Sequence, residues 1–202
     1  MIGLFAYGSL ITHPGHEIES VLDHVIPDVM TPFPVEYARR SQSRAGAPTL
    51  VPVPTGCGAS VKAVVLVLKQ YTRKKKAQNF LYRRELHQEG DLKVIYDDQV
   101  QRQKRDALVI ETMKNQFGLS VIYYTALKPN FTEILDANRT QEDKAELLAR
   151  AAIDSVTQET YAKEMDGIQY LADNIEAGVV TVLTEVYAQA ILSKVGIVSN
   201  LG

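Results

Sequence analysis

The sequence predicts an α+β protein: a small mixed or antiparallel β-barrel or curled sheet with one inserted helix, followed by a helical C-terminal third. Apolar runs with the length and composition of strands recur through residues 1–128, whereas residues 129–202 repeat apolar residues at spacings of three and four. The 202 residues are 46% hydrophobic, which is enough to bury one substantial core. We therefore expect a single domain over residues 1–202.

Strand patterns account for most of the chain before residue 129. The run VKAVVLVL at 61–68 is almost continuously aliphatic, which is typical of a strand covered on both faces. Alternating prolines near the end of 48–54 indicate an edge strand or an irregular extended segment. The other predicted strands are 4–7, 35–41, 91–97, 106–113 and 119–127.

One helix is expected among these strands. Thr72 is the predicted N-cap of residues 72–86, a stretch without Gly or Pro that places Ala77, Phe80 and Leu81 on one face. In the C-terminal third, the predicted helices are 141–158, 166–178 and 179–196. We expect the last of these to pack in the core, with a dimer contact as the alternative.

Composition excludes several classes of partner. The formal net charge is -2, so nucleic acid is not expected as the main partner, and the cations of Arg73–Lys76 are interpreted as a solvated helix face. A single cysteine, Cys57, rules out an internal disulfide and fits a reducing compartment. No basic segment precedes the N-terminal apolar stretch, and no apolar run approaches the ~20 residues that cross a bilayer. We expect a soluble, cytoplasmic protein without a membrane partner.

Glu85 is the side chain that fits its predicted environment least. It follows Leu81 by four residues and so falls on the apolar face of the 72–86 helix. Burial and the C-terminal end of the helix dipole both disfavour a negative charge there, which is the setting of a carboxyl that works as a general acid/base. The alternatives are an earlier end of the helix or an ion pair with Arg83, Arg84 or an arginine of residues 39–44.

The start of the chain holds a second unusual feature. Its apolar run stops abruptly at Tyr7-Gly8-Ser9-Leu10. A surface hairpin is one interpretation of this turn, and a loop shaped to hold a ligand is the other.

Three segments share an order with a known family. They are AYGSL (6–10), RRSQSRAGAPTLVPVPTG (39–56) and YRRELHQEG (82–90). Together they resemble the gamma-glutamylcyclotransferase superfamily, most closely its ChaC-type branch, which acts on glutathione. That family shows a Y-G-S-L turn, a segment of the form S-x-x-x-R-G-x-P, and an R-E-x-x-x-G stretch whose glutamate is catalytic. The C-terminal segments GIQYLADNIEAG (167–178) and KVGIVS (194–199) are also similar to the family's final helices.

The resemblance implies a gamma-glutamylcyclotransferase-like fold and a reaction that releases 5-oxoproline from glutathione or another gamma-glutamyl compound without metal or cofactor. The substrate's alpha-amine attacks its own gamma-amide carbonyl, and Glu85 would be the general acid/base. The Tyr7–Leu10 turn would be a substrate-binding backbone cradle, in which the N–H groups of Gly8, Ser9 and Leu10 hold the glutamyl end and backbone N–H groups stabilise the oxyanion. Arginine side chains suit the carboxylates of the substrate. For the arginines of residues 39–44, a solvated basic strand face is the competing interpretation. The substrate-binding arginines implied are Arg39 and Arg44.

Other functions stay open. A catalytically inert small-molecule-binding module would keep the same fold and pocket, whereas a Ser or Cys hydrolase would require labelling of Ser9 or Cys57 by an active-site-directed electrophile. A zinc site at His13 and His16 is not expected, because no third ligand is evident. The oligomeric state and the roles of His13, His87 and Cys57 do not follow from the sequence.

Overall fold

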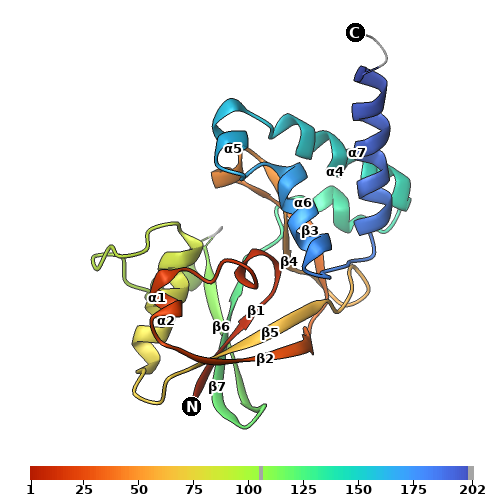
Figure 1. Ribbon diagram of the computed structural model, residues 1–202. Helices are drawn as coiled ribbons and strands as arrows, with labels where there is room; N and C mark the ends of the chain where they lie inside the picture. Colours follow the sequence, from red (N-terminus) through yellow and green to blue (C-terminus); the bar gives the residue numbers. More distant parts are fainter. Residues whose placement is uncertain (105–106, 200–202) are drawn as a thin grey trace. The chain divides into compact units, whose positions relative to one another are not determined.

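The computed structural model describes residues 1–104 and 107–199 (Figure 1). Over these residues the chain is α+β, with a mixed five-stranded sheet and a separate two-stranded sheet. The chain divides into two compact units, each of which is described by itself. Unit 1 comprises residues 1–30 and 62–128, and unit 2 comprises residues 31–61 and the described residues from 129 onward. The single domain expected over residues 1–202 stays a prediction.

Unit 1 is built on the mixed sheet, whose strand order is β2-β5-β1-β7-β6. β1 pairs antiparallel with β5 and parallel with β7, and the outer pairs β2–β5 and β6–β7 are antiparallel. Closure would require β2 to pair with β6. Within the described residues these two strands are the edges of an open sheet, so the barrel alternative of the predicted fold is wrong. The bounds are β1 Ile2–Ala6, β2 Leu22–Met30, β5 Lys62–Leu68, β6 Val109–Gln116 and β7 Leu119–Ala126.

β5 explains why the sheet is buried on both faces. Alternate side chains Val64, Leu66 and Leu68 belong to one apolar cluster, and the residues between them belong to another. Because successive side chains of a strand point to opposite faces, a continuous aliphatic run serves two cores at once. The predicted double-sided burial of 61–68 is confirmed.

Three helices accompany this sheet: α1 His16–Glu19, α2 Lys74–Glu85 and α3 Asp98–Gln103. The predicted apolar face of α2 is confirmed, because Ala77, Phe80 and Leu81 are buried in the cluster that contains the even-numbered side chains of β5. The predicted N-cap is wrong. Arg73 is the N-cap residue, and Thr72 instead donates its backbone N–H to the Lys69 carbonyl oxygen in the preceding turn.

Two predicted strands of this unit need correction. Residues 91–97 form no strand, because side chains of α2 bind their backbone: Arg83 donates to the Val94 carbonyl oxygen and Asn79 accepts from the Tyr96 N–H. The strand predicted at 106–113 is β6, which begins at Val109, and Asp106 lies outside the described residues.

Unit 2 combines a hairpin with the helices of the C-terminal third. β3 Val35–Ser41 matches its predicted bounds and pairs antiparallel with β4 Ala47–Pro52. The predicted helix 141–158 ends early, at Asp154, and the predicted helix 179–196 begins late, at Thr184. The helix bounds are α4 Gln141–Asp154, α5 Gln158–Ala162, α6 Gly167–Glu176 and α7 Thr184–Ser199. No helix in the described ranges has the length and apolar character needed to span a membrane.

Candidate functional site in unit 1

The turn that follows β1 is a single turn of 3-10 helix, and its first residue, Gly8, has a left-handed backbone conformation. Gly8 has φ of 61°, in the region that glycine adopts without steric cost, and the chain then turns through Gly8–Leu10. Leu10 is buried in the apolar cluster beneath the turn, and the Tyr7 hydroxyl donates to the Thr125 carbonyl oxygen at 3.0 Å. The apolar cluster thus holds one end of the turn, at Leu10, and β7 holds the other, at Tyr7.

Arg84, the penultimate residue of α2, holds this turn from the other side. Its Nη2 donates to the Ser9 carbonyl oxygen at 2.9 Å and lies 3.3 Å from Ser9 Oγ. The His13 carbonyl oxygen accepts from both Nε, at 3.0 Å, and Nη2, at 2.7 Å. Because a guanidinium is a rigid planar fork, these bonds fix the end of α2 against residues 9–13.

The third Arg84 nitrogen reaches Glu85. Arg84 Nη1 lies 2.7 Å from Glu85 Oε1, and the two side chains are 12% and 17% exposed. Pairing with an arginine is one of the alternatives that the sequence left open. The other carboxylate oxygen, Oε2, has no hydrogen-bond partner within the part of the chain that the structure describes. One guanidinium therefore contacts both the turn and the carboxylate, and leaves one carboxylate oxygen unengaged.

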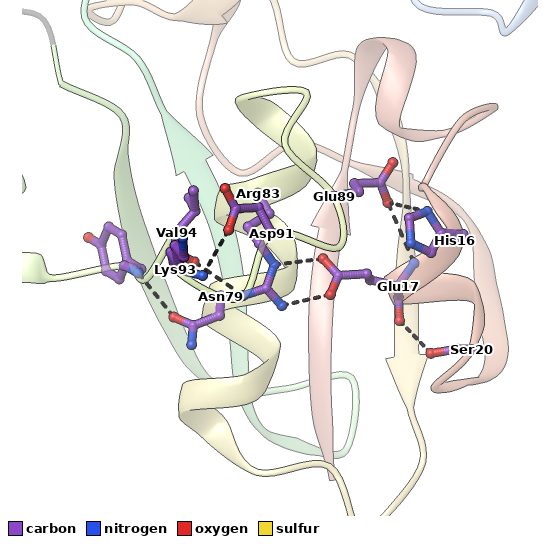
Figure 2. Close-up of polar contacts among 10 residues, drawn as sticks. His16, Glu17, Ser20, Asn79, Arg83, Glu89, Asp91, Lys93 and Val94 are labelled. Carbon is purple, nitrogen blue, oxygen red and sulfur yellow. Dashed lines mark hydrogen bonds and ion pairs between the residues drawn. The ribbon is translucent and has the colours of Figure 1, made fainter.

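A second and more deeply buried ion pair joins Arg83 of α2 to Glu17 of α1 (Figure 2). Arg83 Nε and Nη2 each donate to a different oxygen of Glu17 on α1, both at 2.7 Å, and the two side chains are 4% and 9% exposed. The hydrogen bonds from Arg83 lower the pKa of Glu17, although burial acts in the opposite direction. Arg83 also donates to the Val94 carbonyl oxygen at 3.2 Å. The pair thus joins α1, α2 and the irregular segment after α2.

The loop between the turn and α1 packs closely against the residues after α2. Gly15 has φ of 88°, and a Cβ at this position would collide with the Glu89 carboxylate. The same carboxylate accepts from the Glu17 N–H and lies 3.5 Å from His16 Nδ1 (Figure 2). Residues 9–17 therefore contact residues 83–89 through Arg83, Arg84 and Glu89. Ser9 of the turn and Glu85 belong to these two segments.

The predicted substrate-binding arginines belong to unit 2. Arg39 lies in β3 opposite Thr49, whose hydroxyl donates to the Arg39 carbonyl oxygen at 3.3 Å. The Arg44 guanidinium lies 4.8 Å from the centre of the Tyr170 ring and donates to the Met165 carbonyl oxygen at 3.3 Å. These two contacts join Arg44 to other residues of unit 2. A role of either arginine in substrate binding stays a prediction.

The histidines and the cysteine take varied positions. His13 offers its carbonyl oxygen to Arg84, and its Nδ1 lies 2.9 Å from Thr12 Oγ1. His87 is exposed with φ of 53°, and Cys57 is partly buried in unit 2. The described ranges contain no group of three or more His, Cys, Asp or Glu side chains placed to hold a metal ion.

Sequence reasoning missed two features of this site. It named Arg83 and Arg84 only as possible partners of Glu85, and it did not single out Glu17. The consecutive arginines at the end of a helix are the available indication, because basic side chains there commonly bind carbonyl oxygens. Nothing in one sequence indicates which of 24 acidic residues, here one 66 positions away, pairs with a given arginine.

Comparisons of the chain with protein-family models, with curated proteins and with solved structures find no match.

Proposed function

We propose that the protein is a cofactor-free enzyme of the gamma-glutamylcyclotransferase type, which cleaves glutathione or another gamma-glutamyl compound and releases 5-oxoproline. The observation that carries this proposal is the position of Arg84, which donates both to the Ser9 carbonyl oxygen and to Glu85 Oε1. The Tyr7–Leu10 turn and the Arg-Glu pair are separate parts of the family-like pattern, and Ser9 and Arg84 are 75 positions apart in the sequence. Their contact is what a shared site requires.

The chemistry needs one group that moves protons. A bond forms between the substrate's alpha-nitrogen and its gamma-carbonyl carbon, and the bond from that carbon to the leaving amine breaks. Glu85 accepts the proton that the alpha-amine loses and returns a proton to the leaving amine. Its unengaged Oε2 is the atom suited to both transfers, while Oε1 stays on Arg84 and keeps the carboxylate oriented.

The turn has a different task, which is to stabilise negative charge. The first N–H groups of a helical turn have no acceptor within that turn, so Gly8 and Ser9 can donate to the substrate's carbonyl oxygen as it becomes an oxyanion. Ser9 is not the nucleophile in this mechanism. Its hydroxyl lies 3.3 Å from Arg84, which donates hydrogen bonds and accepts none, and among the described residues no base contacts this hydroxyl to activate it.

The test is mass-spectrometric detection of 5-oxoproline after incubation of the full chain with glutathione and a panel of gamma-glutamyl amino acids and amines. Glu85→Gln is compared with Glu89→Gln, since Glu89 is a nearby carboxylate of similar exposure, 25% against 17%. We expect product from the wild type and from Glu89→Gln, and a loss of at least ~100-fold in Glu85→Gln.

Two results would count against the proposal. Full activity of Glu85→Gln would exclude Glu85 as the proton carrier. A wild-type chain that binds a gamma-glutamyl compound but forms no product from any panel member would favour the alternative, a catalytically inert binding module.

A further inference from the structure

Glu36 is a carboxyl group enclosed in unit 2. It lies on β3 and is 1% exposed. Its Oε1 accepts from the Tyr37 N–H at 2.9 Å and from Thr181 Oγ1 at 2.7 Å. Its Oε2 has no hydrogen-bond partner among the described residues. An ionised carboxylate in this position is almost fully removed from solvent, which is costly.

The Thr181 contact ties β3 to the segment that leads into α7. Thr181 Oγ1 also lies 3.3 Å from the Leu183 N–H, and Thr184 Oγ1 accepts from the Thr181 N–H at 2.8 Å. Thr184 is the first residue of α7. In this segment Val179 and Leu183 are buried, whereas Val180 and Val182 are 54% and 49% exposed. Alternate side chains of the segment are buried, and the Val179 N–H donates to the Asn174 carbonyl oxygen at 2.8 Å. The bond from Thr181 to Glu36 is the side-chain contact that docks the segment on β3.

The groups around Glu36 provide little compensating charge. Tyr37 follows it on β3, and the Tyr37 ring packs against Tyr170 of α6 at 6.4 Å and Tyr187 of α7 at 5.3 Å between centroids. Asp166 places a negative charge near Tyr187. From α4, Lys144 contributes a favourable charge, and β4 (Ala47–Pro52) has no ionisable side chain. Burial outweighs Lys144 and the hydrogen bonds, and raises the pKa of Glu36 from 4.5 to about 7.

We propose that Glu36 is a proton-operated latch: when protonated it keeps residues 179–187 docked on β3, and loss of its proton loosens them. The neutral acid keeps Oε1 as the acceptor for Thr181 and Tyr37 and carries no buried charge. The ionised form has an unfavourable desolvation free energy, which is relieved when the segment opens and admits water. The latch lies in unit 2 and does not depend on the function proposed for unit 1.

The direction of the pH effect follows from linkage. The docked state retains a proton that the open state releases in the window between 4.5 and about 7. Opening therefore becomes more favourable by at most about tenfold per pH unit, in the middle of this window, and it stops changing above the window.

Hydrogen-exchange mass spectrometry of the full chain tests the latch, with rates corrected for the intrinsic pH dependence of exchange. For peptides spanning 179–187, we expect the opening constant to rise about 40-fold between pH 5 and pH 7 and to level off above pH 8. Glu36→Gln keeps an acceptor oxygen and cannot ionise, so its opening constant should be flat. Glu185→Gln removes an exposed carboxyl from the same helix and should behave as the wild type.

Three outcomes would overturn the latch: a flat wild-type profile, a wild-type slope that persists in Glu36→Gln, or an equally steep rise in α4, which would indicate opening of the whole unit. Should Glu36→Gln not fold, a carbon-13 NMR titration of the wild-type Glu36 carboxyl gives an independent answer. A midpoint near 7 supports the latch, and one near the ordinary 4.5 contradicts it.

Discussion

Arg83 binds Glu17 through two parallel hydrogen bonds of 2.7 Å, although 66 positions separate the two residues in the sequence. The next residue, Arg84, turns to the carbonyl oxygens of Ser9 and His13. Two successive arginines at the end of α2 therefore fasten two adjacent segments, α1 and the turn after β1. The geometry of the candidate site depends on both.

Breaking the buried pair from one side should be costly. Arg83→Leu leaves the Glu17 carboxylate buried without its partner, so the free energy of unfolding should fall by about 3–5 kcal/mol. Equilibrium urea unfolding measures this loss. Arg102→Leu is the control, because its ion pairs with Asp98 and Glu111 are exposed and their loss should cost at most about 1 kcal/mol. Equal costs for the two variants would show that the Arg83–Glu17 pair stabilises the fold no more than an exposed ion pair does.

Acid should weaken unit 1 through Glu17. Because the folded-state pKa of Glu17 lies below its ordinary 4.5, the pair contributes fully above that value and is lost as the pH falls through the lower, folded-state pKa. Urea unfolding followed from about pH 6 to pH 2 should show a steeper loss of stability in the wild type than in Glu17→Gln, which has no proton to gain. Parallel curves for the two proteins would contradict the assignment.

The turn should not tolerate a side chain at Gly8. A β-branched residue is strained at φ of 61° and would also stand where the substrate approaches the backbone. Gly118→Val is a matched control, since Gly118 has φ of 73° in the same unit and a Cβ there meets open space. Both variants should lose some stability, but only Gly8→Val should abolish binding of a gamma-glutamyl analogue, measured by calorimetry. Unchanged binding by Gly8→Val would remove the turn from the pocket.

The fork of Arg84 should not be replaceable by lysine. A lysine ammonium cannot reach Ser9, His13 and Glu85 in the planar geometry that the guanidinium provides. Because small displacements of reacting groups are expensive, kcat/KM for 5-oxoproline formation should fall about 100-fold in Arg84→Lys. Arg102→Lys, at an exposed site, should be unaffected. Faster hydrogen exchange in residues 9–13 of Arg84→Lys would accompany the loss, and an unaltered rate together with full activity would refute the positioning role.

Strands with a clear local pattern could be predicted from the sequence. The predicted bounds 35–41 and 61–68 correspond to β3 and β5 within one residue. In β5 the aliphatic run marks burial of both faces, whereas in β3 the sequence does not show that polar Glu36 is buried beside Val35 and Tyr37. β2 was not predicted. Its pairing with β5 shifts register on both sides of His24–Ile26 and much of it is exposed, so no period of two survives.

Features that depend on distant partners could not be predicted. The pattern of residues 91–97 is that of a strand, yet bonds from Asn79 and Arg83 hold their backbone in an irregular path. In the candidate site, the association of Glu85 with the Tyr7–Leu10 turn was expected only through the family resemblance. Helical spacing indicated a buried Glu85, whereas the charged residue that α2 buries most deeply is Arg83.

The parallel pairing of β1 with β7 has a consequence for how the chain is made. Residues 2–4 pair with 121–123, so one edge of β1 stays unpaired until the last strand of its sheet has been synthesised. The β3–β4 hairpin is synthesised in this interval and itself waits for the helices from residue 141 onward. Each unit is thus completed by a segment that is synthesised after part of the other. A fragment that isolates unit 1 must therefore join residues 1–30 to 62–128 through a new linker, because no single truncation of the chain can yield it.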